Sequence, residues 1–147
     1  MTTAEQQRNI FWNMFERELE KQGAPFHICY FSYYATVNRR SARSNYCLSM
    51  DFLVQKGFLR VGIFICDNVP TFEYMYSQKD EIEKLLGFQP KWTIGGERNP
   101  NTRRIEIHIP FVGNVNSYLK AIQSAILYIK KFKQVIPRYS LERLFDY

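Results

Sequence analysis

The sequence has few of the residues that cross-link small secreted proteins or build fibrous ones. Three cysteines are present, Cys29, Cys47 and Cys66, and no two of them form a CxxC pair. A secreted disulfide framework needs an even and denser set, so we expect all three to be reduced and buried as small apolar side chains. Seven glycines among 147 residues also exclude a collagen-like chain, in which roughly every third residue is glycine.

Signals for membranes and secretion are missing as well. No apolar run approaches the roughly 20 residues that are needed to cross a bilayer. The polar segment 1–8 contains Glu5 and lacks the basic and apolar stretches of a signal peptide. These features predict a cytoplasmic protein with neither a membrane partner nor a disulfide-bonded partner.

Familiar catalytic and cofactor motifs are also missing. The sequence contains no P-loop, no GxGxxG and no GxSxG. His27 and Cys29 would share a strand face, but no second pair of ligands follows at zinc-site spacing. His108 is predicted to lie beside Glu106 on a solvated sheet face, and only residue counts support a Cys–His nucleophile pair. We therefore expect no metal, no cofactor and no catalytic residue, and the sequence favours a binding protein over an enzyme.

The composition is that of an ordinary folded domain with an aromatic excess. Hydrophobic residues make up 46% of the chain, which is enough for one core, and the 23% of charged residues argue against disorder. Aromatic residues reach 16%, and 20 basic against 14 acidic residues leave a formal charge of +6. Because no linker or repeat is evident, the length predicts a single domain over residues 1–147.

Apolar residues recur at helical spacing in three segments. The expected helices cover 3–22, 71–86, and a last segment from a cap at Asn114 or Asn116 to Pro137. Gly23 and Gly87 suit the left-handed turns that follow the first two helices. The apolar residues of segment 141–145 suggest that the tail docks as a short helix.

Alternating apolar and polar residues predict five strands. They cover 26–37, 46–55, 59–66, 91–94 and 104–111. The turn at Lys56–Gly57 predicts an antiparallel hairpin, and Gly95–Asn101 predicts a second hairpin loop. The chain is therefore expected to adopt an α+β fold, an antiparallel sheet of about five strands covered by three helices in the order α-β-β-β-α-β-β-α. Seven aromatic residues are predicted to lie in its core: Phe11, Phe15, Phe52, Phe72, Trp92, Phe111 and Phe132.

Two arginine-rich connections are the candidate nucleic-acid site. If they meet in space, they form a phosphate-binding patch, and nearby tyrosines, Tyr46 among them, can stack on bases. An ordinary solvated basic surface is the alternative, because a charge of +6 is modest. The predicted nucleic-acid-binding residues are Arg39, Arg40, Arg43, Arg98, Arg103, Arg104, Tyr33 and Tyr34.

Two further hypotheses use other residues. The segment 30–34 is rich in aromatics, with Tyr30 and Phe31 beside two tyrosines, and could form an apolar patch that a second copy covers in a homodimer. Asp51, Asp67 and Glu106 lie on or after separate predicted strands, and their convergence would make a divalent-metal-dependent, nuclease-like site. However, antiparallel strands with one wet face place acidic residues in this way routinely.

Several segments of the chain carry a pattern that is similar to a known domain family. The run Lys79–Gly87, followed by Trp92, resembles the K-x-x-I-E-x-x-L-G…W core of the DUF4268 domain family. The entry segment Phe11–Phe15, the strand Arg103–Ile107 and the closing run Ile126–Phe132 fit the same pattern. The resemblance implies a domain that commonly stands beside a separate nuclease-like or DNA-associated domain and has no established catalytic residues. Since this chain has no room for such a neighbour, we expect a non-catalytic accessory or interaction domain that contacts nucleic acid or a nuclease complex.

Overall fold

The computed structural model describes residues 3–24, 26, 28–31, 33–37, 46–112 and 115–139. Ten helices and strands follow one another in these ranges. They are α1 (Ala4–Gln22), β1 (Ile28–Tyr30), β2 (Tyr34–Val37), β3 (Tyr46–Leu53), β4 (Phe58–Cys66), α2 (Val69–Ser77), α3 (Lys79–Leu86), β5 (Lys91–Ile94), β6 (Thr102–Pro110) and α4 (Val115–Tyr139). The predicted tail helix and Asn114 lie outside the described residues.

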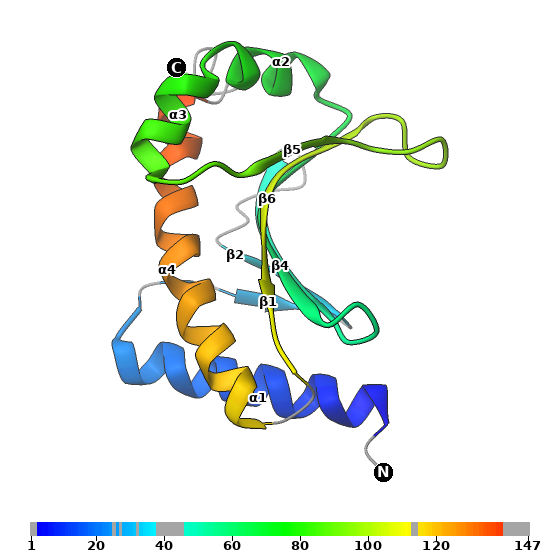
Figure 1. Ribbon diagram of the computed structural model, residues 1–147, viewed down its shortest axis with the longest axis vertical. Coiled ribbons are helices and arrows are strands. Elements are labelled where there is room, and N and C mark those ends of the chain that lie inside the picture. Colours follow the sequence, from blue (N-terminus) through cyan, green and yellow to red (C-terminus); the bar gives the residue numbers. More distant parts are fainter. Residues whose placement is uncertain are drawn as a thin grey trace.

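The six strands form one sheet in the order β1-β2-β3-β4-β6-β5, and every neighbouring pair is antiparallel. Helix α4 packs along the middle of one face of the sheet (Figure 1). Helix α1 crosses α4 at the bottom of the view, and α3 packs against α4 (Figure 1). The sheet bows toward α4, so the face opposite the helices is concave (Figure 1). The expected α+β class is confirmed.

The expected counts of helices and strands were too low at two places. The segment 26–37 is not one strand, because the chain reverses after Tyr30 and the N–H of Phe31 donates to the carbonyl of Tyr34 at 2.8 Å. The segment 71–86 is not one helix, because the backbone leaves helical geometry at Gln78. Helix α2 packs on β4 and β6 whereas α3 packs on α4, so the two halves require different axes.

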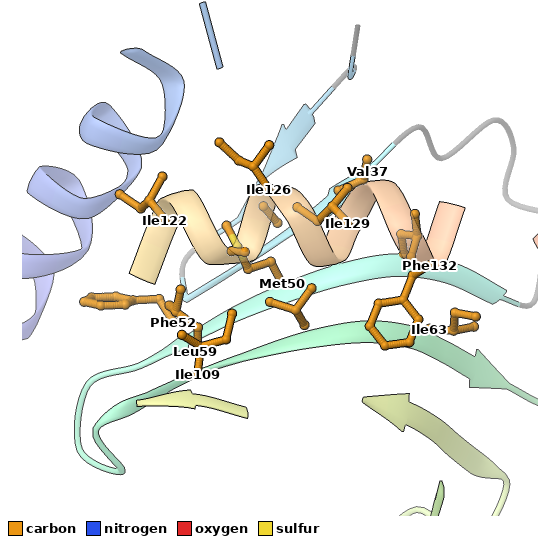
Figure 2. Packing of buried hydrophobic residues seen from close by; sticks show 14 of the residues in the cluster. Val37, Met50, Phe52, Leu59, Ile63, Ile109, Ile122, Ile126, Ile129 and Phe132 are labelled. Atoms are coloured by element: carbon orange, nitrogen blue, oxygen red, sulfur yellow. The ribbon is translucent and has the colours of Figure 1, made fainter. Parts of the chain in front are cut away.

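The buried stripe of α4 forms the centre of the core (Figure 2). Four residues of this helix, Ile122, Ile126, Ile129 and Phe132, have no exposed surface and lie over apolar side chains of β3, β4 and β6. Each fully buried side chain of this size contributes roughly 1.5–3 kcal/mol of hydrophobic stabilisation. Sequence periodicity therefore predicts these four positions correctly, whereas Leu119, which was expected in the same buried stripe, is 40% exposed.

Most of the aromatic excess is packed inside the protein. Phe11 of α1 stacks on Phe52 of β3 with ring centroids 4.2 Å apart. Six of the seven predicted core aromatics are buried, and Trp92 is partly buried against the same cluster.

The three cysteines form no disulfide, and they are partly exposed rather than buried as the sequence predicts. Cys29 is opposite Thr36, Cys47 is opposite Phe64, and Cys66 is opposite Thr102. These positions alternate with the core residues, so the cysteines belong to the sheet face that the helices leave uncovered. Within the described ranges, no helix is both long enough and apolar enough to span a bilayer.

Candidate functional site

Strand register gathers charged side chains on the sheet face opposite the helices. Asp51 of β3 is opposite Arg60 of β4, which is opposite His108 of β6, and Glu106 is opposite Lys91 of β5. Directly opposed residues in antiparallel strands point to the same side of a sheet. We call this surface the concave face, and define it by Thr36, Ser49, Asp51, Arg60, Lys91, Arg104, Glu106 and His108.

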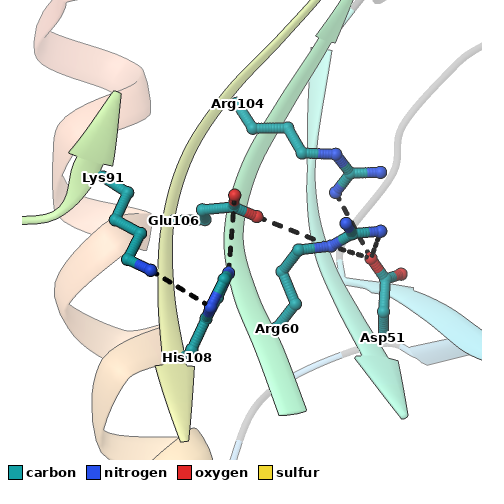
Figure 3. Close-up of polar contacts among 6 residues, drawn as sticks. All are labelled: Asp51, Arg60, Lys91, Arg104, Glu106 and His108. Carbon is teal, nitrogen blue, oxygen red and sulfur yellow. Dashed lines mark hydrogen bonds and ion pairs between the residues drawn. The ribbon is translucent and has the colours of Figure 1, made fainter. Parts of the chain in front are cut away.

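Two arginines share the carboxylate of Asp51 (Figure 3). The Nε and Nη2 atoms of Arg60 lie 2.7 Å and 2.6 Å from Oδ2, and the Nη1 atom of Arg104 lies 3.3 Å from the same oxygen. Asp51 is only 2% exposed. The guanidinium groups of Arg60 and Arg104 therefore both cover its carboxylate and compensate its negative charge. A buried carboxylate requires such partners, because its removal from water is costly.

Glu106 is buried with weaker compensation. Its Oε2 atom lies 3.5 Å from the Nε of Arg60, and its Oε1 atom lies 3.5 Å from the Nε2 of His108. The contact with Arg60 is an ion pair, whereas His108 is charged only when it is protonated, and both distances exceed the usual length of a hydrogen bond. Among the described residues, Oε2 has no hydrogen-bond partner although it is buried. Arg60 is therefore the cation that both acidic side chains of the concave face share.

His108 lies between a cation and an anion. Its Nδ1 atom is 3.5 Å from the Nζ of Lys91, and its ring stacks on Phe58 with centroids 4.2 Å apart. Burial lowers the pKa of His108; Glu106 opposes this shift, while Lys91 and Arg60 reinforce it. An ammonium group can only donate, so the neutral ring accepts at Nδ1 and directs its Nε2–H toward Glu106.

The concave face has an excess of positive charge. Three cations, Arg60, Lys91 and Arg104, lie near two carboxylates, Asp51 and Glu106. Burial, followed by the proximity of Arg60, lowers the pKa of Arg104, but a guanidinium remains protonated at neutral pH. The arrangement is therefore suited to an anion rather than to a metal cation.

Gly62 lies between Ser49 and Glu106 across the centre of the concave face. A Cβ at this position would lie 2.1 Å from the carbonyl oxygen of Ile105 and 2.7 Å from the Cα of Glu106. Real Cβ atoms do not approach backbone so closely, so β4 and β6 can pair here only when residue 62 is glycine.

Aromatic rings lie beside these charges. Tyr34 is opposite Asp51, and its ring stacks on that of Phe31 with centroids 4.7 Å apart and planes 10° from parallel. The ring of Tyr33 lies 5.1 Å from that of Tyr34. Phe31 and Tyr33 are 45% and 47% exposed, so the aromatic cluster (Phe31, Tyr33 and Tyr34) presents open rings to solvent.

Tyr30 does not belong to this aromatic cluster. It is opposite Ala35, a core residue, and its ring packs against Trp12 of α1. Its hydroxyl donates to Glu16, and burial followed by this hydrogen bond raises the pKa of the phenol. Tyr30 is still 39% exposed, so the patch of the homodimer hypothesis is divided: Phe31 and Tyr33 are exposed beside the partly buried Tyr34, and Tyr30 lies apart from them against α1.

The predicted arginines are divided between several places. Arg104 lies on the concave face, but Arg103 is on the other side of β6, where its guanidinium lies over Phe72 and donates to the carbonyls of Pro100 and Thr102. Arg98 is exposed in the β5–β6 connection. Arg39, Arg40 and Arg43 lie outside the described residues.

The strand ends that lead into both arginine-bearing connections lie at the same end of the sheet. Tyr46 is opposite Ile65, which is opposite Arg103, which is opposite Ile94. The described residues Tyr46 and Ile94, which flank segments 38–45 and 95–101 in the sequence, therefore lie in one row across the sheet.

The three carboxylates of the metal hypothesis do not converge. Asp51 and Glu106 both contact Arg60. Asp67 follows Arg60 by seven residues, which corresponds to roughly 23 Å in an extended strand. The N–H of Asp67 instead donates to the carbonyl of Asn101 at 3.1 Å. In the part of the chain that the structure describes, no three His, Cys, Asp or Glu residues are placed to hold a metal ion.

No motif in the sequence marks Arg60 or Lys91 as site residues, and strand alternation predicts only an ordinary solvated face for His108. One signal was available for Arg60, because this residue interrupts an otherwise apolar strand between Leu59 and Val61. Once the turn of the β3–β4 hairpin is placed, its register puts Arg60 opposite Asp51.

The fold and this site define an α+β domain whose antiparallel sheet is covered by helices on one face and carries a buried charge network on the other. The chain belongs to the DUF4268 family, because the family model described as a domain of unknown function matches residues 7–140. The resemblance seen in the sequence is therefore confirmed. Comparisons with curated proteins and with solved structures found no match.

Proposed function

We propose that this protein is a non-catalytic interaction domain that contacts nucleic acid through the concave face. The observation that carries the proposal is the excess of cations on that face beside an exposed aromatic cluster. Phosphate groups are recognised by arginine and lysine, and bases by aromatic rings. The formal charge of +6 favours the same partner.

Arg104 is the central phosphate ligand of this proposal. Within the described residues, only its Nη1 atom donates to a protein acceptor, whereas a guanidinium has five N–H donors in a planar fork. Its side chain is 24% exposed, and its guanidinium lies over the ring of Phe64 at 4.5 Å. Asp51 and Phe64 therefore hold Arg104 in place while other N–H donors stay available for a phosphate oxygen.

The arginine-bearing connections extend this surface. Arg98 of one connection, together with Arg39, Arg40 and Arg43 of the other, would add positive charge at one end of the sheet, where the flanking strands meet. Arg103 is left out of the proposed surface, because its guanidinium faces Phe72 on the opposite side.

The non-catalytic part of the proposal is supported by how the acidic groups are used. The carboxylate of Asp51 accepts from two guanidinium groups, and Glu106 is buried between Arg60 and His108. Carboxylates that are paired with cations in this way are less free to bind a metal ion or to accept a proton from a substrate. Because one hydrophobic cluster includes residues of α1 and α4, we also propose a single domain over residues 1–147. The cytoplasmic location stays a prediction from the sequence.

Binding to short labelled DNA and RNA at about 50 mM and about 200 mM salt tests this function, with fluorescence anisotropy as the readout. We expect affinity to fall steeply with salt. Arg104→Ala and Lys91→Ala should each weaken binding and reduce the slope of log affinity against log salt by about one. Arg17→Ala is the matched control, because Arg17 is exposed on α1, away from the concave face.

The triple variant Arg39→Ala/Arg40→Ala/Arg43→Ala tests the second connection, and we expect it to weaken binding at low salt most strongly. Absence of salt-sensitive binding by the unmodified protein would refute the nucleic-acid proposal. In that event the homodimer becomes the favoured function, and light scattering over a wide concentration range would separate a dimer from a monomer.

A further inference from the structure

The open rings of the aromatic cluster indicate which form of nucleic acid the concave face accepts. Phe31 and Tyr34 already form a stacked pair, 10° from parallel, and Phe31 keeps 45% of its surface exposed. An unpaired base is a flat π surface that can extend such a stack. Bases in a duplex are stacked on each other and paired, so their faces cannot reach a protein ring.

Rings and cations are neighbours on the concave face. Tyr34 is directly opposite Asp51, which places their Cβ atoms about 5 Å apart, and Asp51 holds Arg104 at 3.3 Å. One carboxylate thus separates the aromatic cluster from the proposed phosphate ligand. A single strand that places a base on Phe31 or Tyr33 can therefore bring a neighbouring phosphate toward Arg104.

The concave face also lacks the means of reading a duplex that many other folds have. Duplex DNA is commonly read by a helix that enters the major groove. All four described helices pack on the other side of the sheet (Figure 1). The two carboxylates of the concave face, Asp51 and Glu106, are only 2% and 6% exposed, and they contact arginine and histidine side chains.

We propose that the concave face binds single-stranded nucleic acid, with bases stacked on Phe31 and Tyr33 and phosphates held by Arg104. This inference rests on the proposed function, and it specifies the strand form and the role of each group. Sequence preference is expected to be weak, because every base has a π face and the contacts named here read no base edge.

The test compares three labelled probes of about 12 nucleotides: an oligothymidine strand, an abasic strand of the same length, and a blunt duplex. We expect the oligothymidine strand to bind more tightly than either other probe. Phe31→Ala and Tyr33→Ala should each weaken its binding by roughly 5- to 150-fold, the range found when a stacking aromatic is removed. Neither variant should change binding of the abasic strand.

Matched variants keep this test interpretable. Tyr76→Ala removes an equally exposed ring, 51% exposed, that packs on Trp92 on the helix-covered side, and it should bind as the unmodified protein does. Phe31→Trp should retain binding, and thermal melts by circular dichroism should show that all variants are folded.

The outcomes separate the two proposals. If all probes bind in a salt-dependent way and loss of Phe31 or Tyr33 changes nothing, single-strand stacking is refuted while nucleic-acid contact by the domain stands. Tighter binding of the duplex than of the oligothymidine strand would likewise refute single-strand stacking and leave nucleic-acid contact standing. If no probe binds, both proposals are wrong.

Discussion

Replacement of Arg60 by alanine is the strongest test of the charge network. The substitution removes both short contacts to Asp51 and the nearest cation of Glu106. Among the described residues, Asp51 would retain the 3.3 Å contact with Arg104, and Glu106 would retain its contact with His108. The two carboxylates, which are 2% and 6% exposed in the intact protein, would lose most of their compensation.

The expected loss in free energy of unfolding follows from the burial of Asp51 and Glu106. Removing one partner of a buried ion pair costs about 3–5 kcal/mol, whereas an exposed pair contributes at most about 1 kcal/mol. Because the side chain of Arg60 is itself 22% exposed, we expect a loss near the lower end, about 3 kcal/mol. For a chain of this size such a loss lowers Tm by about 6–12 °C.

Urea unfolding followed by circular dichroism at neutral pH measures this loss directly. Arg17→Ala removes the same charge from an exposed position on α1 and should stay within about 0.5 kcal/mol of the unmodified protein. A loss below about 1 kcal/mol for Arg60→Ala would mean that water, rather than Arg60, compensates the two carboxylates, and the reasoning about a buried network would be wrong.

Two further predictions concern His108 and Gly62. Since burial lowers the pKa of His108 below its unfolded value of about 6.5, the unfolded chain binds a proton more readily, and stability should fall as pH drops from 7 through that value toward the lower folded pKa. His108→Gln should flatten this dependence in urea unfolding at several pH values, and an unchanged slope would contradict the assignment. Gly62→Ala should destabilise by about 3 kcal/mol or more, because its Cβ would lie 2.1 Å from the Ile105 carbonyl oxygen. Gly96→Ala, with nothing within 4 Å of the new Cβ, should be nearly neutral, and equal effects of the two would refute the steric argument.

Features that depend on local periodicity were predictable from the sequence. The stripe that includes Ile126 and Phe132 recurs at helical spacing, and both residues are buried where that spacing places them. The β3–β4 hairpin was predicted from two alternating runs around Gly57, whose φ of 75° suits glycine at the turn. In both cases residues close together in the chain carry the whole signal.

Features that depend on packing partners were not predictable in the same way. The helix expected over 71–86 divides at Gln78, because its first half packs on the sheet and its second half packs on α4. The strand expected over 26–37 divides into β1 and β2. The sequence did not predict this reversal, because segment 30–34 is mostly aromatic and contains neither glycine nor proline. Arg103 and Arg104 were grouped because they are adjacent, yet neighbours on a strand point to opposite faces.

The sequence by itself determined the α+β class, the core face of each long element and the family to which the chain belongs. The β3–β4 hairpin was also expected from the sequence, but the structure decided its register, because the turn spans 54–57, pairs Leu53 with Phe58 and so places Asp51 opposite Arg60. Only the tertiary structure decided that β6 lies between β4 and β5, which brings Glu106 and His108 against Arg60 and Lys91. The physical reason is that a period of two residues specifies the face on which a side chain lies, whereas the neighbouring strand depends on contacts between distant parts of the chain.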